Sequence, residues 1–194
     1  LLRPGEKNPK SPAFALDFEG GLAVVLTEGG AKKRAGVWLL ERAALAAELA
    51  HLGPEPFELD QQGLEEILAR EPRRLHALLR DQRAVAGIGR AWANEILHRA
   101  QLSPFAISTQ LGDTERRRLL HAIVEELERG TVARTRGATD AKTHRIHGKL
   151  GEACYVCGTP IARVDYEEHT VYYCPECQTG GRILKDRRLS RLLR

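Results

Sequence analysis

The four cysteines of the chain occur in two pairs whose spacing suits a metal ion. Cys154 and Cys157 form the first pair, and Cys174 and Cys177 form the second after sixteen intervening residues. A two-residue gap lets both thiolates of a pair reach the same ion, and the spacing between the pairs fits known zinc sites. Four thiolates close a tetrahedron with Zn–S bonds of about 2.3 Å, so we expect one structural zinc ion with no open position for catalysis.

A short β-hairpin is expected to hold these cysteine pairs. Residues Ile161–Asp165 and Thr170–Tyr173 have strand composition, and Gly158 with Thr159-Pro160 suits a tight turn after the first pair. Such a small module has little core of its own, so metal binding would supply its folding energy. Two disulfides or a redox-active CxxC are the alternative interpretations, and the pairing of the cysteines on one ribbon argues against redox chemistry.

Positive charge is concentrated in the last third of the chain. Residues 131–194 contain twelve Lys and Arg against seven Asp and Glu, whereas residues 1–130 contain eighteen against nineteen. A basic region on both sides of a zinc ribbon favours a polyanion such as nucleic acid. A solvated surface without a partner is the alternative. Within this region, residues 131–147 are poor in apolar side chains, and we interpret them as a mobile basic linker.

A glycine turn in the middle of the chain is a second candidate binding feature. Gly87-Ile88-Gly89 precedes a predicted helix that begins at Arg90. The start of a helix presents free N–H groups and the positive end of its dipole, which together bind phosphate. A tight turn between two helices is the alternative, because a GxG sequence is common.

Helices are expected on both sides of this turn. Apolar side chains at helical spacing and helix start and stop signals predict segments at residues 42–51, 61–70, from 72, 90–100 and 113–130. Asp60 and Asp113 are the expected caps of the second and last helices, and Gly130 is the expected end of the last.

The N-terminal segment reads as part of a larger sheet. Residues 13–18 and 22–27 predict a β-hairpin, and Gly36–Leu40 predicts a third strand. The chain contains no methionine and begins at Leu1, so we expect further residues upstream. No apolar run approaches the roughly 20 residues of a membrane-spanning helix, and no leader peptide is recognisable.

Two of these motifs resemble one known family. The segment from Ala77 to Gly89, followed by Ala93–Ala100 and Ser103-Pro104, resembles the helix–two-turns–helix signature of formamidopyrimidine-DNA glycosylase and endonuclease VIII. The segment from His147 to Gln178 resembles the C-terminal zinc finger of the same family, and the two motifs occur in the family's order. The ending after Gln178 resembles that of a bacterial branch with a C-terminal tail.

The resemblance implies an α+β fold in four parts. Residues 1–41 would be the remainder of an N-terminal β-sandwich domain, and residues 42–130 the helix–two-turns–helix DNA-binding domain. Residues 131–149 would be a basic linker, and residues 150–194 the zinc finger with a basic tail.

The resemblance also implies base-excision repair of oxidised bases in duplex DNA. Members of this family remove the base and nick the strand through a Schiff base formed by an amino-terminal proline, with an adjacent glutamate handling protons. Pro4 is followed by Gly5 and is not terminal, so no catalytic residue is assigned in this chain. Both catalytic residues would lie upstream of Leu1.

What the resemblance assigns to this chain is DNA binding. The expected contacts are Lys32, Lys33, Arg34, His76, Gly87, Gly89, Arg90, His147, Lys149 and His169. Arg34 replaces the family's wedge phenylalanine, and Arg90 replaces its asparagine after Gly-Ile-Gly. His76 and His169 stand where the family has lysine and arginine. Without the resemblance, His76 would be interpreted as an ordinary helical histidine.

The leading hypothesis is a bifunctional DNA glycosylase and lyase. It predicts a monomer in a bacterial cytoplasm, associated with the nucleoid, whose partner is duplex DNA with oxidised bases or abasic sites. The alternative hypotheses are a naturally truncated, non-catalytic DNA-binding protein and, less favoured, a zinc-ribbon protein that binds RNA or another protein.

Overall fold

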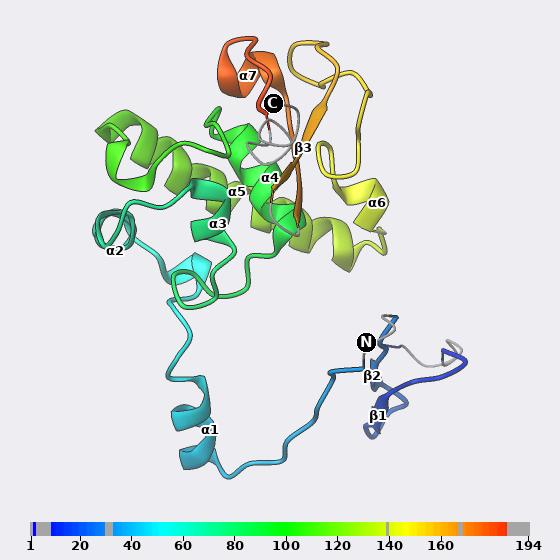
Figure 1. The fold of residues 1–194 in the computed structure, drawn as a ribbon. Coiled ribbons are helices and arrows are strands. Elements are labelled where there is room, and N and C mark those ends of the chain that lie inside the picture. Colours follow the sequence, from blue (N-terminus) through cyan, green and yellow to red (C-terminus); the bar gives the residue numbers. More distant parts are fainter. Residues whose placement is uncertain (1, 3–8, 30–32, 139, 167–168, 186–194) are drawn as a thin grey trace, which may run out of the picture. The chain divides into compact units, whose positions relative to one another are not determined.

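A computed structural model of the chain describes residues 2, 9–29, 33–138, 140–166 and 169–185. The chain divides into two compact units, Leu1–Ala50 and His51–Arg194. Each unit is described by itself below (Figure 1). Among the described residues, no helix is both long and apolar enough to cross a bilayer.

The first unit contains the predicted hairpin and a short helix. Strands β1 (Phe14–Asp17) and β2 (Ala23–Leu26) pair antiparallel, with Phe14 opposite Leu26. Helix α1 (Arg42–Leu49) follows and buries none of its residues. The predicted third strand at residues 36–40 is wrong, because these residues form no ladder in the described part of this unit. A strand exists only when it pairs with a neighbour, and β-type composition alone does not supply one.

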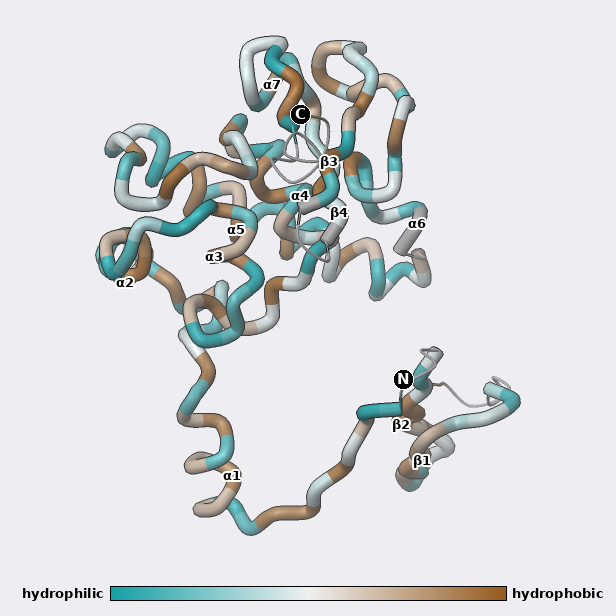
Figure 2. Tube along the Cα trace, viewed as in Figure 1, coloured by the Kyte–Doolittle hydropathy of each residue, from teal (hydrophilic) through white to brown (hydrophobic). Residues whose placement is uncertain are grey.

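The second unit begins with a helical domain around one apolar core. Its elements are η1 (Pro56–Glu58), α2 (Gln61–Ala69), α3 (Leu75–Leu79), α4 (Arg90–Arg99), η2 (Ser108–Gln110), α5 (Asp113–Thr135) and α6 (Asp140–Thr143). Leucine and isoleucine side chains of α2, α3, α4 and α5 form this core. Figure 2 shows hydrophobic residues alternating with hydrophilic ones along these helices. Helix α4 lies at its centre: its residues Ala93, Ile96 and Leu97 are fully buried. The remaining faces of α4 can therefore position side chains rigidly.

The ends of these helices follow the sequence signals in part. Asp60 caps α2 as predicted, since its carboxylate accepts the Gly63 N–H at 2.7 Å. At α5, Asp113 is the first helical residue rather than the cap, and Glu115 accepts the Gly112 N–H at 2.9 Å. Pro72 lies ahead of α3, which begins at Leu75.

Gly130 does not end α5, which continues to Thr135. A Cβ atom at Gly130 would lie 2.2 Å from the ring of Trp92 on α4. A glycine is therefore needed where the two helices touch. Because glycine is also common at the ends of helices, the sequence wrongly predicted that α5 ends at Gly130.

A small β-hairpin with a terminal helix follows. Strands β3 (Ala162–Tyr166) and β4 (His169–Tyr173) pair antiparallel, with Val164 opposite Val171. Helix α7 (Pro175–Thr179) begins directly after Cys174. Phe105 of the helical domain packs against the Val164 and Val171 face, so residues outside the hairpin complete its core.

The stretch from 131 to 149, predicted as a mobile basic linker, contains helical segments and one buried apolar residue among its described residues. Its first five residues belong to α5, α6 lies within it, and Ile146 is fully buried beside Cys154 and Cys174. Ile146 attaches this basic segment to the cysteine module, because its side chain enters the apolar cluster next to the cysteines.

Candidate metal centre and nucleic-acid interface

The side chains of the four cysteines converge at the end of the hairpin. The Sγ atoms of Cys157 and Cys174 are 3.4 Å apart, those of Cys157 and Cys177 are 3.4 Å apart, and those of Cys154 and Cys177 are 3.9 Å apart. A tetrahedron with Zn–S bonds of about 2.3 Å has S···S edges of about 3.8 Å. The sulfur spacing therefore fits one structural metal ion.

His98 is a fifth donor beside this cluster, and the sequence analysis did not identify it. It comes from the last turn of α4, and its Nε2 lies 3.2 Å from Sγ of Cys154. The donor atoms of His98, Cys154, Cys174 and Cys177 all lie within 4.8 Å of one another. No fixed spacing links a helical histidine to cysteines more than fifty residues away, so only the tertiary structure reveals this contact.

Burial differs strongly among these donors. His98, Cys154 and Cys174 are buried, Cys177 is partly buried and Cys157 is exposed. Burial lowers the pKa of His98 to about 4 and raises the pKa of the Cys174 thiol to about 11. Hydrogen bonding to Thr159 lowers the pKa of Cys157 to about 6. A bound cation favours the thiolate at every such position.

Gln178 connects the cysteine module to the helical domain. Its buried amide donates to the Leu102 carbonyl at 2.9 Å and accepts the Cys174 N–H at 2.9 Å. The same module contacts α4 through His98, whose ring centroid lies 5.0 Å from that of Tyr155. The cysteine module is therefore docked on α4 rather than loosely attached.

The turn before α4 is held by the side chain of Gln82. Gln82 accepts the Gly87 N–H at 2.8 Å and donates to the Ile88 carbonyl at 2.9 Å. Gly87 has a φ of 75°, a conformation that favours glycine, whereas Gly89 is extended and precedes the first residue of the helix. The turn thus presents the N-terminus of α4 and the exposed Arg90 to solvent.

Aromatic rings surround the first turns of α4. Successive ring centroids lie 5.1 Å apart for Trp92 and His144, 5.6 Å for His144 and His147, and 5.2 Å for His147 and Tyr172. Asn94 donates its side-chain amide to Nδ1 of His147, with 2.8 Å between the nitrogens. This arrangement leaves Nε2 of neutral His147 as an N–H donor. Burial lowers the pKa of His147, the neighbouring His144 and Arg90 act in the same direction, and Glu95 opposes them.

A buried carboxylate fixes the segment that carries His147. Glu95 is 3% exposed, and its oxygens accept the N–H groups of Arg145, Ile146 and His147 at 3.0, 2.9 and 2.8 Å. Arg129 lies 3.9 Å away and pairs with Glu126 at 2.6 Å. Glu95 therefore joins α4 to the start of the cysteine module.

The predicted contacts are distributed between the two units. Arg90, His147 and Lys149 belong to the second unit, where Lys149 pairs with Glu152 at 3.4 Å. His76 is 4% exposed in the helical core, so the structure does not present it to a DNA backbone. Lys33 and Arg34 are exposed in the first unit. Lys32 and the side chain of His169 lie outside the described residues.

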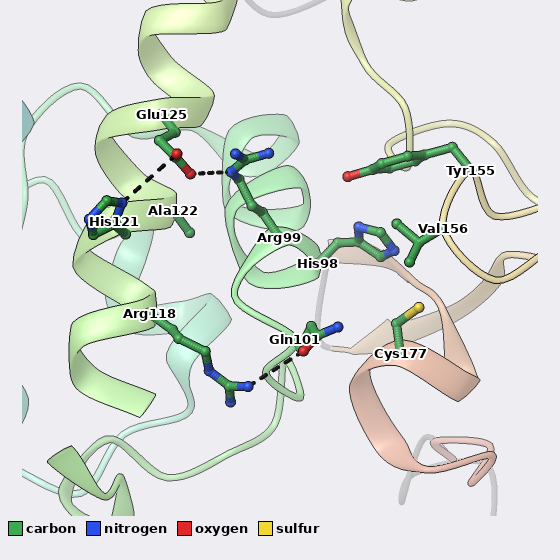
Figure 3. A pocket seen from close by; sticks show the side chains of 10 residues that line it. All are labelled: His98, Arg99, Gln101, Arg118, His121, Ala122, Glu125, Tyr155, Val156 and Cys177. Atoms are coloured by element: carbon green, nitrogen blue, oxygen red, sulfur yellow. Dashed lines mark hydrogen bonds and ion pairs between the residues drawn. The ribbon is translucent and has the colours of Figure 1, made fainter. Parts of the chain in front are cut away.

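A pocket of about 320 Å³ lies between α4, α5 and the cysteine module (Figure 3). Its polar walls include an ion pair between Arg99 and Glu125 at 2.5 Å. Arg118 donates to Gln101 at 3.5 Å, and His98 and Cys177 line the side towards the metal centre. The cluster of cysteines and His98 is thus adjacent to an open pocket.

Comparison with known proteins identifies the class first. Residues 52–142 match the family model described as the formamidopyrimidine-DNA glycosylase H2TH domain. The match covers the helices from α2 to α5 and the turn before α4, and it ends three residues before the segment held by Glu95. The second unit is therefore a helix–two-turns–helix domain followed by a cysteine hairpin.

The chain belongs to the formamidopyrimidine-DNA glycosylase family. It is 37% identical over 150 residues to an "Uncharacterized formamidopyrimidine-DNA glycosylase-like protein" of Mycobacterium tuberculosis, covering 74% of this chain and 94% of that protein. It is 33% identical over 191 residues to the formamidopyrimidine-DNA glycosylase of Chloroflexus aurantiacus, covering 92% of this chain and 68% of that enzyme.

Solved structures of the family share the fold, which mixes helices and strands. The Lactococcus lactis enzyme, solved with DNA containing an abasic site, matches with a TM-score of 0.63 at 26% identity over 70% of this chain and 55% of that one. The chain spans 51–60% of the length of two further glycosylases that it matches.

Proposed function

We propose that the chain is the DNA-holding part of a DNA glycosylase and abasic-site lyase that acts on oxidised bases. The observation that carries this proposal is the meeting of three cationic or N–H-donating features in one place. The start of α4, its Arg90 and the His147–Lys149 segment lie together, because Glu95 and Asn94 of α4 hold that segment. Helix N–H groups, arginine and a histidine N–H are all phosphate donors.

The proposed DNA contacts in this unit are Gly87, Gly89, Arg90, His147, Lys149 and His169. In the first unit, Lys32, Lys33 and Arg34 are proposed as further DNA contacts. His76 is left out because it is buried. The partner is duplex DNA with oxidised bases or abasic sites, bound by a monomer in a bacterial cytoplasm at the nucleoid.

We propose a single zinc ion held by Cys154, Cys157, Cys174 and Cys177. The ion would be structural, because four thiolates leave no position for water or substrate. The protein's side chains then fix the hairpin on α4 through Gln178 and His98. We also propose four parts of the chain: the remainder of a β-sandwich domain at residues 1–41, the helix–two-turns–helix DNA-binding domain at 42–130, a basic linker at 131–149 and the zinc finger with its basic tail at 150–194.

The proposed chemical step needs the amine of an amino-terminal proline that is followed by glutamate. Pro4 does not meet this requirement, because it is followed by Gly5 and is not the first residue. Borohydride trapping on abasic-site DNA, with the full-length product of the gene, tests the lyase. A covalent protein–DNA adduct is expected. Its absence from an intact, DNA-binding protein would reject the lyase function.

A non-catalytic DNA-binding protein is the second candidate, and one observation favours it. The 150 residues aligned with the Mycobacterium tuberculosis relative make up 94% of that protein, whereas 161 aligned residues are only 60% of the Edwardsiella ictaluri glycosylase. A short form of the family therefore exists. Under this hypothesis the protein binds damaged duplex tightly and gives no trapped adduct.

The binding surface itself is tested with Arg90→Ala. Fluorescence anisotropy on a duplex with an abasic-site analogue should show weaker binding and a salt slope reduced by about 0.9, because the variant neutralises one phosphate fewer. Arg117→Ala is the matched control, since Arg117 is exposed on α5 outside this cluster. Equal affinities and slopes for the two variants would remove Arg90 from the DNA surface.

A further inference from the structure

The cysteine cluster has more donors than a tetrahedral ion can use. Cys154, Cys157, Cys174 and Cys177 form one set of four, and His98 with Cys154, Cys174 and Cys177 forms another. The three sulfur atoms of Cys154, Cys174 and Cys177 are common to both sets. The two sets differ only in whether Cys157 or His98 completes them.

Cys157 and His98, the two interchangeable donors, differ in solvent exposure and in how tightly the surrounding structure packs against them. Cys157 is exposed at the turn of the first cysteine pair. His98 is 2% exposed, sits on the central helix α4 and packs against Tyr155. Because an exposed thiolate is the one most open to oxidants and competing ligands, Cys157 is the ligand that the site loses first.

We propose that His98 is a reserve metal ligand, which completes a Cys3His site when Cys157 is removed from the ion. The proposal rests on the metal site proposed above. The bond from the ion to Sγ of Cys157 breaks, and a bond to Nε2 of neutral His98 forms. The imidazole proton moves from Nε2 to Nδ1, so no proton is gained or lost by the ring. Cys3His is an established ligand set for structural zinc.

The surroundings of His98 explain why it is the reserve and Cys157 the first choice. With Cys157 in place, Nε2–H of His98 donates to Sγ of Cys154 at 3.2 Å. Nδ1 is buried and has no hydrogen-bond partner among the described residues. A ligating histidine normally donates its second ring N–H to a partner. Coordination by His98 would leave a buried N–H without an acceptor, which makes it weaker than a fourth thiolate.

Cobalt(II) loading of the 194-residue chain tests this inference, because its absorption reports the number of thiolate ligands. The variants are Cys157→Ala, His98→Phe and the double variant, each measured for bound metal per chain and for cobalt affinity. Wild type and His98→Phe should each bind one ion with the same thiolate-to-cobalt band. Cys157→Ala should bind one ion with about three quarters of that intensity, as three thiolates remain of four. The double variant should bind at least about tenfold more weakly than Cys157→Ala.

The variant with both Cys154→Ala and Cys157→Ala is the matched control, because it leaves only two thiolates beside His98. It should lose the ion although His98 is present. His98→Gln, which keeps a side-chain donor, replaces His98→Phe if circular dichroism shows that the phenylalanine variant does not fold. X-ray absorption of zinc-loaded Cys157→Ala should show one nitrogen and three sulfur ligands.

Three results would overturn the inference. Cys157→Ala could bind no ion, the double variant could bind as tightly as Cys157→Ala, or His98→Phe alone could lower the metal content. If the wild-type chain binds no ion at all, the metal site itself fails. DNA affinity of the wild type is measured separately, so failure of the reserve ligand is distinguishable from failure of the proposed function.

Discussion

Single polar residues inside the helical domain decide where the proposed binding segments lie. Glu95 is the clearest case, because a buried carboxylate on α4 accepts three consecutive N–H groups from residues 145–147. A carboxylate can satisfy several N–H donors at once, and each bond to the charged group is stronger than a neutral one. Asn94, the preceding residue, orients the ring of His147 by a hydrogen bond. Neighbouring residues of one helix therefore fix both the backbone and a side chain of the same segment.

Glu95→Gln tests this anchor. Its amide has one oxygen for three N–H groups and adds its own N–H groups, so buried donors lose their acceptor. The free energy of unfolding should fall by about 1–3 kcal/mol, measured by urea denaturation of the metal-loaded chain. Glu128→Gln, on the exposed face of α5, should stay within about 0.5 kcal/mol of wild type. Equal stability of the two variants would show that Glu95 is not an anchor.

At the scale of elements, the connection between α3 and α4 is a rigid turn rather than a flexible loop. Asp81 pairs with Arg73 at 2.7 Å and accepts the Arg83 N–H at 3.0 Å. Its backbone carbonyl accepts the N–H groups of Ala84 and Val85. Asp81 and Gln82 together hold both halves of the turn, so the direction of α4 relative to α3 is set before any ligand binds.

The Asp81 pair makes stability depend on pH. The hydrogen bond from Arg73, aided by that from the Arg83 N–H, lowers the pKa of Asp81 from its ordinary value of 3.8. A lowered folded-state pKa means that the stabilisation is present above about pH 4 and is lost as the pH falls through the folded-state value. The free energy of unfolding should therefore decrease less steeply below pH 4 in Asp81→Asn than in wild type.

Arg73→Met provides the matching test from the other side of this pair. It should flatten the part of the acid limb that depends on the Asp81–Arg73 pair, and in the double variant this part should not flatten further, because each single change already removes that pair. Thermal unfolding between pH 2 and pH 5 provides the measurement. Additive effects of the two substitutions would mean that Asp81 and Arg73 act independently.

At the scale of the whole second unit, the helical domain and the cysteine module form one body. Gln178, His98 and Glu95 connect them at three separate points. Ile146 and Phe105 enter the apolar clusters of the module from outside the hairpin. A duplex would therefore meet the start of α4 and the hairpin as parts of a single surface.

Loss of the metal should disturb this surface as a whole. Cys154→Ser combined with Cys157→Ser leaves two thiolates and is expected to release zinc and to unfold the hairpin, since metal binding would supply its folding energy. DNA affinity should fall, and the slope of its logarithm against that of the salt concentration should become shallower by about 0.9 for each phosphate that the protein no longer neutralises. Metal analysis measures the bound zinc. Anisotropy titrations between about 50 and 200 mM salt measure the DNA affinity and its salt slope. Reconstituted wild type is the control, and retained zinc with unchanged affinity would contradict the prediction.

Local sequence patterns predicted the features whose physics is local. The four cysteines, the Asp60 cap, the first hairpin and the α4 boundaries all follow from spacing, capping and alternation within a few residues. The resemblance to the formamidopyrimidine-DNA glycosylase family came from two such motifs in series, and the comparisons confirm it.

Only the tertiary structure decided the features that depend on residues far apart in the chain. Gly130 is a packing residue because Trp92 lies against it, and residues 36–40 form no strand because no partner lies beside them in the described part of their unit. His98 reaches Cys154, and Glu95 reaches Ile146, across more than fifty residues. Burial and hydrogen bonding of these side chains arise from packing between elements. A pattern of residues along the chain does not report which distant elements pack together.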